Sequence, residues 1–218
     1  MVSLELVIGN RNYSSWSLRP WIAMKVAGIP FRETVVPLYR EDSEAVLMRH
    51  SRAGKVPVLK DGELVVWESL AILEYLAERF PAARLWPEDV RARAVARSVS
   101  NEMHAGFSDL RNHMTMNVRK SLPGRGRADG VTEDIDRIRE IWRDCRLRFG
   151  AGGPYLFGGF TAADAMFAPV VSRFTTYAVD LDPVCATYRD AIQSLPAMRE
   201  WTDAAKAEPW TIDRYEVA

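Results

Sequence analysis

Asn12-Tyr13-Ser14-Ser15-Trp16-Ser17-Leu18-Arg19-Pro20-Trp21 joins an apolar strand, predicted at residues 4–8, to an amphipathic helix predicted to run to about Ala27. Pro20 lacks an N–H and is tolerated in a first turn, so we expect the helix to begin at Trp16 or Ser17, with Ser17 as the N-cap. A helix start presents unpaired N–H groups and a partial positive charge. The segment therefore predicts an anion site suited to a thiolate; a serine-rich loop that only caps the helix is the alternative.

The composition is that of an ordinary globular chain. Its 218 residues are 48% hydrophobic, which suffices for a buried core in one large domain or two small ones. The 29 basic residues balance the 29 acidic ones, which argues against nucleic acid or an anionic membrane as a partner. No apolar run approaches a membrane span, and residues 1–5 lack the start of a signal peptide, so the expected location is cytoplasmic.

Cysteine and histidine are too sparse for a redox or metal site. Cys145 and Cys185 lie far apart and form no Cys-x-x-Cys motif, and residues 12–17 hold no thiol, which a thioredoxin-like redox enzyme would need there. The histidines have neither a paired spacing nor a cysteine partner: His50, His104 and His113. We therefore expect no metal.

The first 80 residues alternate strand and helix signals. After the first helix we predict a strand at Phe31–Pro37, a helix at Glu41–His50, strands at 54–60 and 63–66, and a helix at Ser69–Phe80. Asp61-Gly62 between two apolar runs is a hairpin signal. The predicted order is βαβ followed by αββα.

Two prolines in residues 81–87 mark a linker, and the sequence after it predicts helices only. We expect helices from Glu88 to about Arg119, at Asp134–Phe149 and at Thr161–Ala178, with shorter ones near 184–194 and 197–207. The run Thr161-Ala162-Ala163-Asp164 has the form of a capping box, in which threonine and aspartate satisfy each other's backbone donors.

Several of these features together resemble the glutathione transferase family. Ser14-Ser15-Trp16-Ser17-Leu18-Arg19 is similar to the Ser-Ser-Cys-Ser-Trp-Arg motif of its zeta class, with Trp16 in place of the cysteine and Leu18 in place of the tryptophan. Val56-Pro57 occupies the place of the family's cis-proline, and the capping box is similar to the one in its second domain. The resemblance extends over nearly the whole chain.

The resemblance implies a two-domain fold. We expect an α/β thioredoxin-like domain at residues 1–80, a linker at 81–87, and an all-α helical bundle at 88–218 that carries the electrophile pocket and the dimer contacts. Family members are two-fold homodimers, so a homodimer is expected here.

The resemblance also assigns site residues on the first domain. Ser14 would be the catalytic residue that hydrogen-bonds the sulfur of glutathione, with Tyr13 as the rival because other classes use a tyrosine. The expected glutathione-binding residues are Ser15, Lys55, Val56, Glu68 and Ser69. Glu68-Ser69 would hold the γ-glutamyl group; as an alternative, Ser69 is an ordinary N-cap and Glu68 a charge that compensates the helix dipole.

The expected electrophile pocket draws on residues 101–117. If these are helical, His104 and Arg111 share a face near an adaptable methionine, Met116, and Arg111 together with Arg173 would favour an electrophile with a carboxylate. In the alternative, Arg111 is solvated or bridges the dimer, and the apolar residues of this segment form a stripe that packs into the core. The residues of this core stripe are Met103, Phe107, Leu110 and Met114.

Three functions are consistent with the sequence. The first is a glutathione transferase that uses glutathione as cosubstrate, without a metal, and attacks a small electrophile. The second is a glutathione-dependent maleylacetoacetate cis-trans isomerase, against which the missing cysteine counts, as does Thr176 at the place of a zeta-class arginine. The third is a non-catalytic binding module on the same fold.

Overall fold

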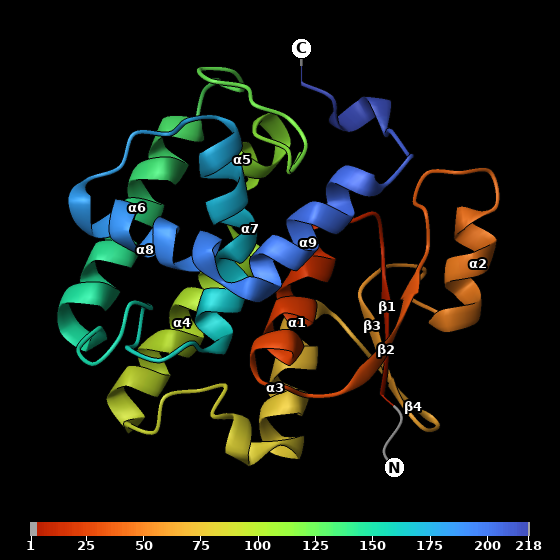
Figure 1. Cartoon of the computed structure of the whole chain (residues 1–218), viewed down its shortest axis with the longest axis horizontal. Coiled ribbons are helices and arrows are strands. Elements are labelled where there is room, and N and C mark those ends of the chain that lie inside the picture. The colour runs from red at the N-terminus through yellow and green to blue at the C-terminus, as the bar shows by residue number, and fades with distance from the viewer. Residues whose placement is uncertain (1–3, 218) are drawn as a thin grey trace.

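The structure is a computed structural model that describes residues 4–217, and it begins with a four-stranded mixed sheet (Figure 1). The strand order is β2-β1-β3-β4, with β1 parallel to β2 and antiparallel to β3. The strands are β1 (Leu4–Ile8), β2 (Phe31–Val35), β3 (Val58–Asp61) and β4 (Leu64–Trp67). The hairpin at Asp61-Gly62 is confirmed, with Gly62 in the left-handed region at φ 59°. Pro57 follows a cis peptide bond, as predicted.

Both faces of the sheet are covered because side chains of β1 alternate between them. Leu6 and Ile8 belong to the main core, on the face covered by α1 (Ser15–Val26) and α3 (Ser69–Arg79). Val7 points the other way, into a smaller core with Leu47 of α2 (Ser43–His50). Figure 1 shows α2 alone on its side of the sheet, with α1 between the sheet and the helical part of the chain.

The second half of the described chain is helical, as predicted, apart from two isolated bridges at residues 155–159. Its long helices are α4 (Val90–Ala105), α6 (Val131–Phe149), α7 (Ala162–Thr176), α8 (Pro183–Ser194) and α9 (Pro196–Ala207). Helix α7 is buried along almost its whole length and packs on α1, α4 and α8. It is therefore the main element that joins the sheet region to the bundle, beside smaller contacts of α9 with α1 and of α4 with α3. Short 3₁₀ turns occupy Pro81–Ala83, within the predicted linker, and Asp213–Tyr215 near the carboxyl end.

The single helix predicted from Glu88 to Arg119 is wrong. Helix α4 ends at Ala105, and a short helix α5 (Ser108–His113) begins after Phe107, whose backbone is left-handed at φ 60°. The break keeps the Phe107 ring in the core. The core stripe offered as the alternative is confirmed, because all four of its members are buried: Met103, Phe107, Leu110 and Met114.

The capping box at the start of α7 is confirmed. The Asp164 carboxylate accepts hydrogen bonds from the backbone N–H of Thr161 at 2.8 Å and from the Thr161 hydroxyl at 2.9 Å. Its second oxygen accepts from the N–H of Leu156 at 3.0 Å. Complete burial nevertheless raises the pKa of Asp164 to about 6, because desolvation outweighs these hydrogen bonds.

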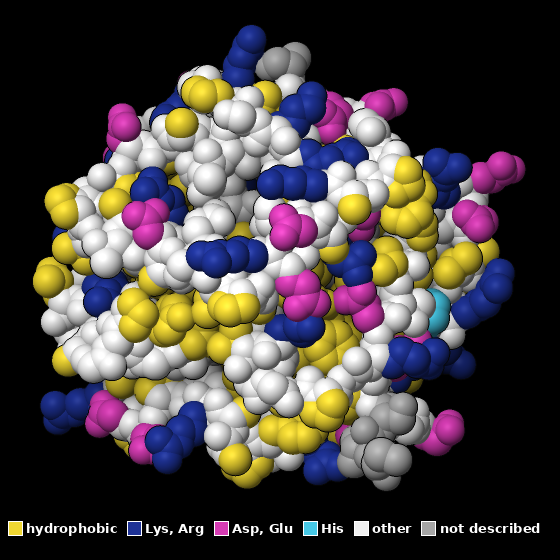
Figure 2. Space-filling view, in the orientation of Figure 1, with side chains coloured by type: hydrophobic (Ala, Val, Ile, Leu, Met, Phe, Trp, Pro, Cys, Tyr) yellow, Lys and Arg dark blue, Asp and Glu magenta, His cyan; other side chains and the backbone are white. Residues whose placement is uncertain are grey.

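The surface carries charges of both signs. Figure 2 shows lysine and arginine interspersed with aspartate and glutamate over the visible face, with no large field of one sign. Within residues 4–217, no helix is long and apolar enough to cross a membrane.

Candidate active site

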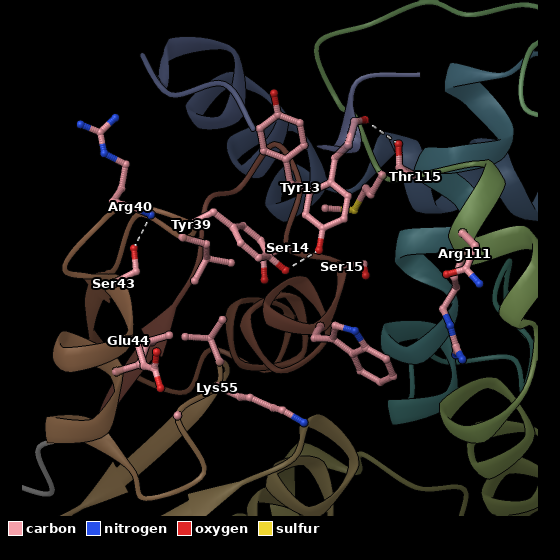
Figure 3. Close-up of a pocket in the computed structure, with 18 of the residues that line it drawn as sticks. Tyr13, Ser14, Ser15, Tyr39, Arg40, Ser43, Glu44, Lys55, Arg111 and Thr115 are labelled. Carbon is pink, nitrogen blue, oxygen red and sulfur yellow. Dashed lines mark hydrogen bonds between the residues drawn. The ribbon is translucent and has the colours of Figure 1, made fainter. Parts of the chain in front are cut away.

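A cavity of about 640 Å³ lies between the loop before α1 and the start of the bundle (Figure 3). One wall comes from the sheet region and the other from the bundle and the carboxyl-terminal segment. The sheet-region wall includes Tyr13, Ser14, Ser15, Trp16, Tyr39, Arg40, Glu44, Lys55 and Val56, and the opposite wall includes Arg111, Asn112, Thr115, Met116, Arg173 and Tyr215.

Helix α1 begins one residue earlier than predicted, at Ser15, and its N-cap is Ser14 instead of Ser17. The Ser17 hydroxyl instead accepts the backbone N–H of Gly9 at 3.1 Å and thereby fixes the end of β1 against the helix. It also accepts a 2.7 Å hydrogen bond from the Ser14 hydroxyl. The two serines thus form a short chain of hydroxyls at the helix start.

Ser14 lies where a helix terminus meets the cavity. Its side chain lines the cavity and makes no capping hydrogen bond to the backbone. The N–H groups of Trp16 and Ser17, in the first turn, donate to no acceptor among residues 4–217. A hydroxyl donor and open N–H groups at a helix N-terminus are together suited to a thiolate.

The Tyr13 hydroxyl is occupied elsewhere. It donates to the Glu216 carboxylate at 2.6 Å and accepts a hydrogen bond from Arg119 at 2.9 Å. The proton that would stabilise a thiolate is therefore committed to the carboxyl-terminal segment. The Ser14 hydroxyl also has an acceptor, but this is the neutral hydroxyl of Ser17 at 2.7 Å, which a thiolate replaces more easily than a carboxylate. The contrast favours Ser14 over Tyr13 as the thiol-activating residue.

The predicted glutathione-binding residues fall into two groups. Ser15, Lys55 and Val56 line the cavity. Glu68 and Ser69 are not among its lining residues; they lie at the start of α3, where Glu68 has φ 70° and Ser69 is fully buried. The interpretation of Ser69 as an ordinary N-cap is wrong, because the N-cap position is Glu68 and no side chain caps the helix. The role of the five residues stays a prediction.

Three arginines near the cavity have no carboxylate partner within salt-bridge distance among the described residues. Arg19 and Arg173 are only 2% and 5% exposed. Arg173 donates to the carbonyl of Met114 at 2.8 Å and to the Ser15 hydroxyl at 3.4 Å, and Arg111 donates weakly to the carbonyls of residues 103 and 104. Burial lowers the pKa of Arg173 to about 10, and repulsion from Arg111 adds to this shift. Unbalanced positive charge of this kind attracts an anion.

Trp16, which replaces the motif's cysteine, organises these cations. The guanidinium of Arg19 lies 4.1 Å from the centre of its ring and that of Arg111 at 5.5 Å, both as cation–π contacts. The imidazole of His104 meets the same ring edge-on at 5.2 Å, and its Nε2 lies 3.8 Å from the Glu68 carboxylate. His104 is not among the residues that line the cavity, whereas Arg111 and Met116 are. Sequence reasoning missed Trp16, although its place in the motif was a signal.

The carboxyl-terminal segment was also missed. After α9, the Glu208 carboxylate accepts the N–H groups of Arg11 and Asn12 at 2.8 and 3.3 Å, and it anchors this segment beside the loop before α1. Tyr215 then reaches the cavity. The sequence of residues 208–217 carries no motif that could have revealed these contacts.

No cysteine of the described chain is available as a nucleophile. Cys145 and Cys185 are unpaired and buried, and burial raises the pKa of each thiol to about 12. Between residues 4 and 217, no group of three or more histidine, cysteine, aspartate or glutamate side chains is arranged to hold a metal ion. Any thiol chemistry in the cavity therefore needs a thiol from a ligand.

Comparison with known proteins gives two matching family models and a set of relatives. Residues 13–79 match the model described as glutathione S-transferase, N-terminal domain, and residues 128–204 match the C-terminal domain. A zeta-class glutathione S-transferase of Euphorbia esula is 31% identical over 192 residues, which is 84% of this chain and 83% of that protein. Maleylacetoacetate isomerase of Rattus norvegicus is 28% identical over 180 residues, 79% of each chain.

Solved structures share the fold. A glutathione transferase homologue from Burkholderia with bound glutathione superposes with a TM-score of 0.71 at 20% identity, covering 94% of this chain and 100% of that one. A zeta-class bacterial maleylpyruvate isomerase gives a TM-score of 0.70 at 23% identity, covering 94% and 98%.

Proposed function

This chain belongs to the glutathione S-transferase family of glutathione-dependent enzymes, and from that premise we propose that it activates the thiol of glutathione for attack on a small electrophile. The observation that carries the proposal is the Ser14 hydroxyl at the start of α1, inside the cavity. Lowering a thiol pKa by about two units from about 8.5 needs about 2.7 kcal/mol. One hydroxyl donor to a charged sulfur, about 1.5–3 kcal/mol, and a helix N-terminus, about 0.3–1 kcal/mol, together give about 1.8–4 kcal/mol, a range that includes this value.

The rest of glutathione would extend along the sheet-region wall. The backbone of Val56 would pair with the cysteinyl part, and Ser15 and Lys55 line the cavity beside it. The γ-glutamyl group would lie at Glu68 and Ser69. Arg19 donates to the Ser69 hydroxyl oxygen at 3.4 Å, which leaves the hydroxyl proton available to a carboxylate.

We propose that the electrophile is anionic. The charged residues that line the cavity are Arg40, Lys55, Arg111 and Arg173 against a single acidic residue, Glu44. In Figure 3, Arg111 approaches from the bundle, opposite the wall that carries Ser14 and Lys55. A carboxylate near Arg111 and Arg173 would supply the counter-charge that these guanidinium groups lack.

A glutathione-dependent cis-trans isomerase of the maleylacetoacetate type is the second candidate. The same cationic wall favours it, because a dicarboxylate substrate would need guanidinium partners. Thr176, at the place of the zeta-class arginine, uses its hydroxyl to donate to the carbonyl of Asn117 at 3.0 Å. Arg173, one turn earlier on α7, could replace that arginine.

A homodimer is the expectation from the family. Light scattering should give a mass near twice the chain's 24.7 kDa. The cytoplasmic location of the protein stays a prediction.

Calorimetry with glutathione tests the proposed function. We expect binding at or below millimolar concentrations, followed by conjugation of an anionic electrophile. Absence of binding would leave the non-catalytic module as the function. If glutathione binds, an assay of maleylacetone isomerisation separates the transferase from the isomerase.

A further inference from the structure

Two tyrosines from opposite ends of the chain meet in the cavity. Tyr39 follows β2, Tyr215 belongs to the carboxyl-terminal 3₁₀ turn, and both line the cavity that contains Ser14. Their hydroxyl oxygens are 2.6 Å apart, and their rings meet edge to face at 5.6 Å. In Figure 3 the Tyr39 side chain points from its loop toward the middle of the cavity.

This hydroxyl pair has a proton to spare. Each phenol carries one proton, and the hydrogen bond between them uses one of the two. Neither hydroxyl has another partner among residues 4–217. Burial raises the pKa of Tyr215 to about 12, helped by its hydrogen bond with Tyr39. At neutral pH the pair is therefore a hydrogen-bond donor and not a base.

The pair is held in place by its neighbours. The Thr115 hydroxyl donates to the backbone carbonyl of Tyr215 at 2.7 Å. The next residue, Glu216, accepts from Tyr13 at 2.6 Å and from Asn117 at 2.9 Å, so both sides of the cavity fix this turn. The Arg214 guanidinium covers the Tyr39 ring at 4.9 Å. A donor fixed before the ligand arrives needs little reorganisation to act.

We propose that the hydroxyl pair of Tyr39 and Tyr215 donates a hydrogen bond to a carbonyl oxygen of the electrophile, and that the preferred electrophiles are conjugated carbonyl compounds. The proposal rests on the proposed function, because it needs glutathione in the cavity. Tyr39 belongs to the sheet-region wall and Tyr215 to the carboxyl-terminal segment. Among the described residues, no other uncharged donor on the cavity rim is formed jointly by these two parts of the chain. The pair would therefore contact the substrate at a different atom from the carboxylate that Arg111 and Arg173 attract.

The chemistry matches this placement. When the thiolate attacks the β-carbon of a conjugated carbonyl, the sulfur electron pair forms the C–S bond and the π pair of the alkene moves toward the carbonyl. The negative charge then resides on the oxygen as an enolate. A proton from solvent, replacing the one that the thiol released, completes addition at the α-carbon. A phenolic donor at that oxygen is more strongly bound in the transition state than in the ground state. Aryl and alkyl halides develop no such oxygen and would gain nothing from the pair.

Calorimetry with two matched conjugates tests the proposal without turnover. S-(3-oxobutyl)glutathione carries the carbonyl and S-butylglutathione does not, and glutathione alone serves as the reference. We expect the wild-type protein to bind the carbonyl conjugate roughly three- to tenfold more tightly, the effect of one neutral hydrogen bond. The double variant Tyr39→Phe with Tyr215→Phe, which keeps both rings, should lose this preference and bind S-butylglutathione as before.

Tyr75→Phe is the matched control, because its hydroxyl donates to Asp61 at 2.7 Å, and Tyr75 is not a lining residue of the cavity. It should keep the full preference. If the double variant does not fold, the comparison of the two conjugates in the wild-type protein still tests the proposal, because either single variant would leave one phenolic donor in place. Binding of glutathione without any preference of the wild-type protein for the carbonyl conjugate, or a preference that survives in the double variant, overturns the proposal. Failure of glutathione itself to bind overturns the proposed function and this inference with it.

Discussion

The two walls of the cavity are built in different ways. On the sheet-region wall, Tyr13 to Trp16 come from the loop before α1 and the first turn of that helix, and Lys55 and Val56 from the residues before one strand. On the opposite wall, Arg111 comes from α5, Arg173 from α7 and Tyr215 from the carboxyl-terminal turn. The first wall is local in sequence, and the second exists only after the bundle has packed.

The walls also differ in charge and in the chemistry that they support. The sheet-region wall offers hydroxyls and a helix N-terminus, which suit a thiolate. The opposite wall offers guanidinium groups without carboxylate partners among the described residues, which suit the anionic part of a substrate. Activation of glutathione is thus concentrated in one loop, whereas the selectivity for the electrophile is distributed over distant segments.

The opposite wall depends on the packing of the bundle. Substitutions in the helices that carry this wall should therefore lower the free energy of unfolding more than substitutions elsewhere. Asp164→Ala removes three hydrogen bonds at the buried start of α7, the helix that carries Arg173. We expect a loss of about 2–4 kcal/mol in the free energy of unfolding, measured with urea. Asp182→Ala, which removes the half-buried cap of α8, should cost about 1 kcal/mol. Equal losses in the two variants would contradict the central role of α7.

The same carboxyl group should make stability depend on pH. The pKa of Asp164 is raised from 3.8 to about 6 in the folded state, so the folded protein binds this proton more tightly than the unfolded chain. Its contribution to stability is therefore complete below pH 3.8 and declines as the pH rises through 6. Relative to Asp164→Asn, which does not titrate, wild-type stability should fall across that window. A rise or a constant difference would be inconsistent with the buried carboxyl.

A substitution on the wall that would bind the electrophile should have a smaller effect than the loss of stability in Asp164→Ala. Arg111→Met keeps much of the length of the side chain but removes the charge, and we expect KM for an anionic electrophile to rise about tenfold. KM for a neutral electrophile should hardly change. Arg125→Met, in an exposed loop outside the cavity lining, is the matched control and should leave both values unaltered. Equal effects of Arg111→Met on the two electrophiles would mean that Arg111 supports structure and that the second wall is not an anion site.

The parts of the fold that sequence could predict are those with local signals. Asp61-Gly62 indicated the hairpin and Thr161 with Asp164 the capping box, because each depends on residues within a few positions of one another. The break at Gly106 and Phe107 was not predicted. Phe107 adopts a left-handed backbone so that its ring can enter the core, and tertiary packing of this kind overrides helix propensity.

The site follows the same division. Ser14 and Ser15 could be named from a motif, whereas Tyr215 could not, because its place depends on contacts with residues more than 100 positions away, such as Tyr39. Arg111 was predicted to lie in the pocket because a continuous helix over residues 101–117 would place it on the same face as His104. That continuous helix does not exist, yet Arg111 lines the cavity. It lies on α5, the short helix that follows the break.

The thiol pKa of bound glutathione is the most direct test of the central claim that Ser14 activates the cosubstrate. The absorbance of the thiolate can be followed against pH in the wild-type protein and in two variants. We expect Ser14→Ala to raise the pKa of the bound thiol by about 1–2 units, since a hydrogen bond to a charged group contributes about 1.5–3 kcal/mol, with little change in glutathione affinity. Tyr13→Phe should leave that pKa nearly unchanged, because the Tyr13 hydroxyl is held by Glu216. A large shift in Tyr13→Phe with none in Ser14→Ala would contradict the account and move the thiol-activating role to Tyr13.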